Sequence, residues 1–142
     1  MVTVKQLLEG KGQDVWSVSP DDTVFEAVQA MADKDVGALM VLSEGRVAGV
    51  VSERDYARRI ALEGRASRDT KVADIMTTRV VYALPSQTVD ECLALMTDKR
   101  IRHLPVMDGD QLIGVLSIGD LVKSIIDEQR HVIEQLEQYI AG

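Results

Sequence analysis

The stretch GVLSIGD, residues Gly114 to Asp120, occurs a second time in this chain as GVVSERD, residues Gly49 to Asp55. Both copies begin as an apolar strand and end in small and polar residues, a pattern typical of a strand that turns into a helix. The two copies lie 65 residues apart. They decide the fold, because they belong to a longer internal duplication.

The duplication covers 46 positions without a gap, since residues 15–60 match residues 80–125 at 15 identical positions. Each copy predicts the order β-α-β-β-α. The first strands are expected at Val15–Val18 and Val80–Ala83. The paired later strands are joined by the turns SEGR and DGDQ, which favour hairpins.

Both first helices are predicted to begin at a capping box, in which a Thr and a Glu three residues later satisfy the free amides of the helix start. The boxes are Thr23 with Glu26 and Thr88 with Glu91. Cys92, the only cysteine, falls on the apolar stripe of the second of these helices. We therefore expect Cys92 to pack in the core, and no disulfide to form within the chain.

Each copy has about 50 residues and is too short to bury its sheet alone. The sequence therefore predicts an α/β (α+β) fold, in which two tandem repeats pack about a pseudo-twofold axis and a long C-terminal helix follows. The expected division is 1–66 for repeat 1, 67–126 for repeat 2 and 127–142 for a helical extension.

The C-terminal helix carries an apolar stripe that needs a partner surface. Two interpretations stay open: the stripe packs on the body of the protein, or it forms a dimer contact, since twofold dimers are the commonest oligomers. The stripe consists of Val122, Ile125, Ile126, Val132, Ile133, Leu136 and Ile140.

Composition excludes several classes of function. The chain has 142 residues, 46% of them hydrophobic, and a net charge of −7, which disfavours binding to nucleic acid or to anionic membranes. One cysteine and two histidines offer no recognisable metal site, and no pattern of a catalytic nucleophile with its base is present. No signal peptide and no membrane span are evident. We expect a cytoplasmic protein that is not an enzyme and needs no metal.

Several motifs resemble those of a tandem CBS-domain pair, or Bateman module. They are the duplicated GVVSERD and GVLSIGD, the lead-in VADIMT (Val72 to Thr77) and the strand IRHLPVMD (Ile101 to Asp108). The resemblance covers about residues 4–126, so the chain resembles a stand-alone CBS-domain protein. It implies a regulatory module that senses energy or redox state. Such a module binds an adenine nucleotide (AMP, ATP or NAD) in the cleft between its repeats and signals by conformational change.

The resemblance also implies a homodimer and an unidentified regulated protein as partners. The alternative is a purely structural module for protein–protein interaction, without a physiological ligand. The two hypotheses differ in whether an adenine nucleotide stabilises the purified protein.

Asp55 and Asp120 have a chemistry that suits a ribonucleotide. An ionised carboxylate accepts hydrogen bonds, and a ribose offers two neighbouring hydroxyl donors. Ser52 and Ser117 could meet a phosphate or ribose oxygen together with the amides of the helix start. However, Ser-x-x-Asp at a helix start is itself a capping pattern. From the residues alone, capping and ribose binding both stay open.

The two repeats differ in where they carry positive charge. Arg54 aligns with Gly119, whereas Arg102 and His103 align with Gly37 and Ala38. An Arg or His at either place could bind a phosphate.

The neighbouring residues complete the predicted site. Pro105 suits an edge strand whose backbone could read adenine, and Gly49 and Gly114 would keep their strands slim beside a ligand. The resemblance adds Thr77 and Thr78 as contacts of the base. The predicted nucleotide-binding residues are Gly37, Ala38, Ser52, Arg54, Asp55, Thr77, Thr78, Ile101, Arg102, His103, Leu104, Pro105, Ser117, Gly119 and Asp120.

Overall fold

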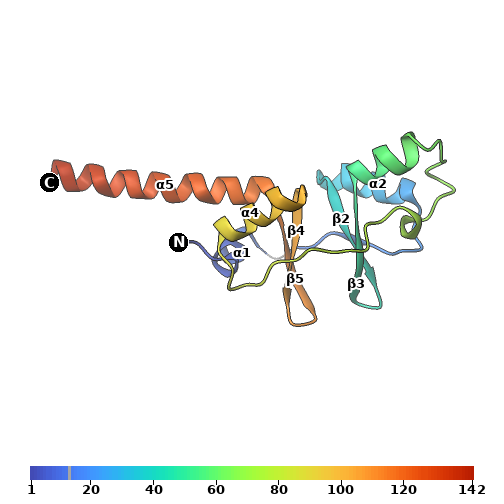
Figure 1. The fold of residues 1–142 in the computed structure, drawn as a ribbon, viewed down its shortest axis with the longest axis horizontal. Coiled ribbons are helices and arrows are strands. Elements are labelled where there is room, and N and C mark those ends of the chain that lie inside the picture. Colours follow the sequence, from blue (N-terminus) through green and yellow to red (C-terminus); the bar gives the residue numbers. More distant parts are fainter. Residues whose placement is uncertain (13) are drawn as a thin grey trace. The chain divides into compact units, whose positions relative to one another are not determined.

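The computed structural model describes residues 1–12 and 14–142, and it confirms the mixed α+β architecture with a long C-terminal helix (Figure 1). Equivalent elements of the two repeats lie 65 residues apart, as the duplication predicts. They are α2 (Val24–Lys34) with α4 (Val89–Lys99), β2 (Ala38–Ser43) with β4 (His103–Asp108), and β3 (Arg46–Ser52) with β5 (Gln111–Ser117).

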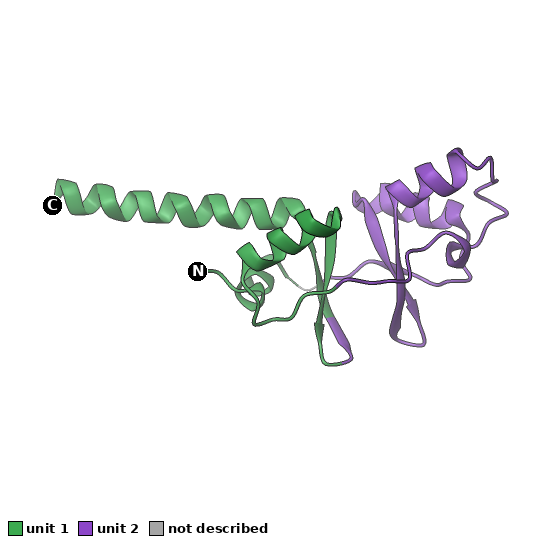
Figure 2. Cartoon of the chain, viewed as in Figure 1, with its two compact units in different colours: residues 1–13, 82–109, 113–142 green, residues 14–81, 110–112 purple. Residues whose placement is uncertain are grey.

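The chain forms two compact units (Figure 2). The first-repeat unit consists of residues 14–81 and 110–112, and the second-repeat unit of residues 1–13, 82–109 and 113–142. The N-terminal segment therefore belongs to the unit of the second repeat, and the connector between the repeats belongs to the unit of the first. The predicted repeat boundaries at 66/67 and 126/127 describe the sequence duplication and stay a prediction.

Two short helical segments lead into the repeats, α1 (Val4–Lys11) and η2 (Val72–Asp74, a 3-10 helix). Val4 donates its N–H to the carbonyl of Gln87 at 2.8 Å, and Val72 donates to the carbonyl of Asp22 at 2.8 Å. The two bonds are equivalent because Gln87 and Asp22 are 65 residues apart. Each lead-in thus packs in the unit of the repeat that it does not immediately precede.

The first-repeat unit holds a three-stranded sheet in the order β1-β2-β3, with β1 at Ser17–Val18. β1 pairs with β2 in parallel, and β2 pairs with β3 in antiparallel. Thr77 of the connector adds one antiparallel bridge to Val50 on β3. The core between sheet and helices is aliphatic, consisting of Val24, Ala27, Met31, Leu39, Val41, Val51, Ile60, Val72 and Ile75.

In the second-repeat unit, β4 pairs with β5, and the predicted strand Val80–Ala83 is wrong, since only Ala83 makes a parallel bridge to Val106. The first repeat shows the reason. There Met40 donates its N–H to the carbonyl of Trp16 at 3.2 Å, and the residue equivalent to Met40 is Pro105. Proline has no N–H, so the parallel pairing cannot extend by that hydrogen bond.

The helices that follow β3 and β5 also differ. α5 (Ile118–Ala141) is a regular α-helix, whereas in the first repeat α3 (Glu53–Asp55) passes into a π-helix, η1 (Tyr56–Ala61). The wider turn is visible in its hydrogen bonds, because Leu62 donates to the carbonyl of Ala57, five residues back, at 3.2 Å. In the part of the chain that the structure describes, no helix has both the length and the apolar character needed to cross a bilayer.

Candidate functional site

The junction between β3 and α3 and the junction between β5 and α5 gather most of the predicted site residues. Glu53 donates its N–H to the carbonyl of Gly37 at 3.0 Å, and Ile118 donates to the carbonyl of Arg102 at 2.9 Å. These equivalent bonds fix each helix start beside the residue that precedes the central strand. In the first repeat, Ala38 is also the cross-strand partner of Ser52.

Both Ser-x-x-Asp motifs are capping boxes, so the capping interpretation is confirmed. Ser52 donates its backbone N–H to Asp55 Oδ2 at 2.9 Å, and the Asp55 N–H donates to Ser52 Oγ at 3.2 Å. The corresponding distances for Ser117 and Asp120 are 2.8 and 3.1 Å. Each carboxylate is therefore held rigidly at its junction by the backbone of its own helix start.

Capping leaves each carboxylate further acceptor capacity, because two carboxylate oxygens carry about four lone-pair sites. In the first repeat the lead-in reaches this carboxylate, since Thr77 Oγ1 donates to Asp55 Oδ1 at 3.4 Å. The structure thus brings Thr77 to the first-repeat junction, and Thr78 follows it as an exposed residue.

Lys11, at the end of α1, reaches the second-repeat junction and was not predicted from the sequence. Its Nζ lies 2.5 Å from Asp120 Oδ2 and 2.5 Å from the carbonyl oxygen of Val115. Burial by itself would raise the pKa of Asp120. Hydrogen bonds from Lys11 and Ser117 outweigh burial, and the pKa of Asp120 lies below its usual value.

We expect Lys11→Met to lower the free energy of unfolding at pH 7 by about 1 kcal/mol or less, because the pair is partly exposed. A carboxylate with a lowered pKa stabilises the folded state above its unfolded pKa of about 4, and this contribution is lost as the pH falls through the folded pKa. The difference between wild type and Lys11→Met should therefore shrink below about pH 4. Urea unfolding at pH 7 and pH 3 measures it.

Lys5→Met is the matched control, since Lys5 is an exposed lysine of the same helix and its substitution should change stability little at either pH. If Lys11→Met lowers the free energy of unfolding by the same amount at pH 7 and at pH 3, Lys11 does not stabilise the fold through the Asp120 carboxylate.

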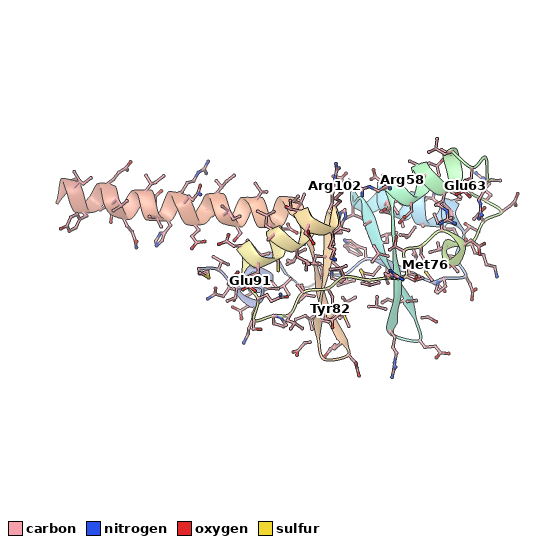
Figure 3. The ribbon with its side chains drawn as sticks, in the orientation of Figure 1. Arg58, Glu63, Met76, Tyr82, Glu91 and Arg102 are labelled. Carbon is pink, nitrogen blue, oxygen red and sulfur yellow. The ribbon has the colours of Figure 1, made fainter. Side chains whose placement is uncertain are left out.

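Most of the remaining predicted residues lie along or just before β4. Arg102 is exposed at the start of this strand (Figure 3), His103 is half-buried, and Leu104 and Pro105 are buried. Pro105 lies on an edge strand, as predicted, because β4 is one of the two strands of its sheet, although the Pro105 carbonyl accepts the N–H of Ala83 at 2.8 Å. The Leu104 side chain is fully buried in the core. Ile101 is half-buried, whereas Gly119 and Arg54 are exposed at the two helix starts.

The two strand glycines make room for the lead-ins, which differs from the expectation that they face a ligand. A Cβ atom at Gly49 would lie 2.7 Å from the carbonyl oxygen of Thr77 and 3.0 Å from the sulfur of Met76, which Figure 3 places beside β3. A Cβ atom at Gly114 would lie 2.7 Å from a methyl carbon of Leu8. Met76 and Leu8 are therefore the equivalent contacts of the two lead-ins.

Other places in the fold offer less to an anionic ligand. A shallow hollow on α4 includes none of the predicted residues and is lined by Asp90, Leu93, Ala94, Thr97 and Asp98. Cys92 is buried in the core as predicted, and burial, with a smaller effect of Glu91, raises the pKa of its thiol to about 11. Residues 1–12 and 14–142 contain no group of three His, Cys, Asp or Glu side chains placed to hold a metal ion.

Known proteins with CBS domains resemble this chain. A model of the CBS domain matches residues 11–62 and 72–127. The protein named CBS domain-containing protein CBSX3, mitochondrial, of Arabidopsis thaliana is 40% identical over 150 residues, which cover 99% of this chain and 72% of that protein. A solved protein with CBS domains from Burkholderia ambifaria MC40-6 is 50% identical, with a TM-score of 0.87 over 90% of this chain and 96% of that one.

A more distant solved structure shares the fold. The CBS domain pair of protein MJ0100, in complex with 5′-methylthioadenosine and S-adenosyl-L-methionine, is 20% identical with a TM-score of 0.79. The match covers 90% of this chain and 98% of that one.

Proposed function

Because the chain belongs to the CBS-domain family, we propose that it is a regulatory module that binds an adenine nucleotide of the AMP, ATP or NAD type at its strand–helix junctions. The ligand would act as a regulator, and its binding would be transmitted as a change of conformation. The proposal concerns binding, and it assigns no reaction and no metal to the chain. A cytoplasmic location stays a prediction from the sequence.

The observation that carries the proposal is the pair of carboxylates held at equivalent junctions. Asp55 and Asp120 each accept a hydrogen bond from the backbone N–H three residues earlier, so their orientation is fixed before any ligand arrives. A pre-oriented carboxylate in the first turn of a helix can accept hydrogen bonds from both hydroxyls of a ribose without losing side-chain entropy on binding.

Cationic side chains near the carboxylates favour a phosphorylated ligand. The first-repeat junction has Arg54, and the second has Arg102 with His103. Lys11 adds an ammonium group at the second junction. Arginine binds phosphate with two parallel hydrogen bonds, so a nucleotide should bind more tightly than its nucleoside. The adenosyl ligands of the MJ0100 pair show that this fold accommodates adenosine derivatives.

The lead-ins offer a route for the signal. Thr77 bonds to Asp55, and Lys11 bonds to Asp120, so each candidate carboxylate also holds a segment from outside its own repeat. A ribose that hydrogen-bonds to these carboxylate oxygens would displace Thr77 or Lys11 and so weaken the attachment of the lead-in. Ligand binding can shift such an equilibrium only by its differential affinity for the two states, and the exchange of acceptor partners supplies that difference.

The first test is a thermal-shift measurement on protein stripped of ligand by unfolding and refolding. AMP, ATP and NAD should be compared with adenosine and GMP as matched controls. A ligand at one hundred times its Kd stabilises the folded state by about 2.7 kcal/mol, which raises the Tm by several degrees. We expect at least one adenine nucleotide to do so, with a smaller effect of adenosine at equal concentration.

No shift with any adenine nucleotide at millimolar concentration would contradict the proposal. That outcome would favour the alternative, a structural module for protein–protein interaction, which the exposed apolar face of α5 supports. We also propose that the chain acts as a homodimer, and the same face supports this. Native mass spectrometry of the freshly purified protein would identify a retained ligand and report the oligomeric state in one measurement.

A further inference from the structure

Helix α5 exposes an apolar face along most of its length. Leu121 and Ser124, near its start, are buried in the second-repeat unit, whereas the helix beyond them extends past α4 and the sheet of its own unit (Figure 1). Packing on the body of the protein is therefore wrong for most of the predicted stripe. The exposed members are Val122, Ile126, Val132, Ile133, Leu136, Tyr139 and Ile140, with exposed fractions from 43% to 85%.

We propose that this face of α5 pairs with the same face of a second copy as an antiparallel coiled coil. The inference gives the homodimer its surface, and it is independent of the proposed ligand. Its first support is the spacing. Successive seam residues lie four, three, four, three and four positions apart, which is the 3.5-residue period of a left-handed coiled coil. The seam consists of Val122, Ile126, Gln129, Ile133, Leu136 and Ile140.

The charge of this segment speaks against a membrane surface as the partner. Residues 127–142 contain four acidic side chains and one arginine. Amphipathic helices that lie on anionic membranes are rich in Lys and Arg instead.

The residues that flank the seam select the antiparallel orientation. One flank carries charges, Lys123, Arg130 and Glu137, and the other is apolar, Ile125, Val132 and Tyr139. In an antiparallel pair like flanks face each other, whereas in a parallel pair unlike flanks do. An antiparallel pair thus brings charge to charge, and a parallel pair would set charges against apolar side chains.

The register follows from matching the charges. When Ile133 lies opposite Leu136 of the second copy, Arg130 lies opposite Glu137 of the second copy, and the twofold axis repeats this pair. On the other flank Val132 then meets Tyr139 of the second copy, and their apolar surfaces are covered. Antiparallel helices also place opposite ends of their macrodipoles side by side. In this register Gln129 also faces Ile140 of the second copy, so the seam from residue 129 to residue 140 is paired together with both charged positions.

A charge-reversal series in the full-length chain tests the inference by sedimentation equilibrium. Arg130→Glu alone, or Glu137→Arg alone, places like charges opposite each other twice per dimer. Each single variant should raise the dissociation constant of the dimer roughly tenfold, since exposed ion pairs contribute up to about 1 kcal/mol each. The double variant Arg130→Glu with Glu137→Arg restores both pairs and should recover the wild-type dissociation constant.

Glu134→Arg is the matched control, because residue 134 lies off the seam and off both flanks, and it should leave association unchanged. Recovery in the double variant supports the antiparallel pair. If both single variants associate like wild type, or the double variant associates no better than the single ones, the inference is wrong. Thermal shifts with AMP on the same variants separate the two proposals, since loss of association with retained ligand binding leaves the proposed function intact.

Discussion

Asp120→Asn is expected to bind AMP about 10–100-fold more weakly than the wild type at the second-repeat junction. The substitution removes the negative charge that two ribose hydroxyls would share, and a hydrogen bond to a charged group contributes about 1.5–3 kcal/mol. The fold should survive, because the amide oxygen of Asn can still accept the N–H of Ser117 and keep the cap. Isothermal titration calorimetry on ligand-free protein measures the affinity and the number of sites.

Two further variants make this result interpretable. Asp55→Asn should remove or weaken the other site in the same way, so the two single variants together tell which junction binds more tightly. Asp108→Asn, at an exposed residue at the end of β4, should leave the affinity as in wild type. Unchanged AMP affinity in the Asp120→Asn protein, with urea unfolding showing an intact fold, would remove Asp120 from the site and leave it as a helix cap.

Gly49→Ala is expected to lower the free energy of unfolding by about 2 kcal/mol, because overpacking a well-packed position costs roughly 1–3 kcal/mol. The new methyl group would lie 2.7 Å from the backbone oxygen of Thr77. The Thr77 backbone can move away from this methyl group only if the lead-in separates from β3. The two hydrogen bonds between Thr77 and Val50, at 2.8 and 3.0 Å, would then break. Urea unfolding followed by circular dichroism measures the loss.

Gly114→Ala is the matched variant, and we expect it to lower the free energy of unfolding by at least 1 kcal/mol less than Gly49→Ala does. Its new methyl group would meet the far end of the Leu8 side chain, which can rotate, whereas a carbonyl oxygen in a hydrogen-bonded bridge cannot. Equal losses in the two variants would mean that the close approach of Thr77 to β3 is not what limits residue 49.

Sequence reasoning was most successful where a signal is local. The Thr-x-x-Glu and Ser-x-x-Asp motifs predict helix starts, and all of them form capping boxes in the structure. The place of Cys92 on the apolar stripe predicts a core position, and Cys92 is fully buried. These predictions hold because caps and amphipathic stripes depend on residues three or four positions apart in one helix.

The sequence does not predict contacts between segments that are far apart in the chain. The duplication predicts a strand at Val80–Ala83, but Pro105 on the facing strand has no N–H to extend the pairing. Lys11 was missed because its partner, Asp120, is 109 residues away. A signal was present nonetheless: aligning TVKQLL at residues 3–8 with KVADIM at residues 71–76 matches Leu8 to Met76, and so points to equivalent lead-ins.

The sequence by itself determined the duplication, the order of the helices and the hairpin strands in each repeat, and the residues at both strand–helix junctions, because each of these depends on a periodic or short-range pattern. Only the tertiary structure decided which lead-in packs with which repeat, and hence that Asp55 is bonded by Thr77 and Asp120 by Lys11. Those pairings depend on how the chain returns in space to a strand it left long before, and no local spacing records that path. The same holds for α5, whose stripe was evident in the sequence and whose exposure only the folded chain reveals.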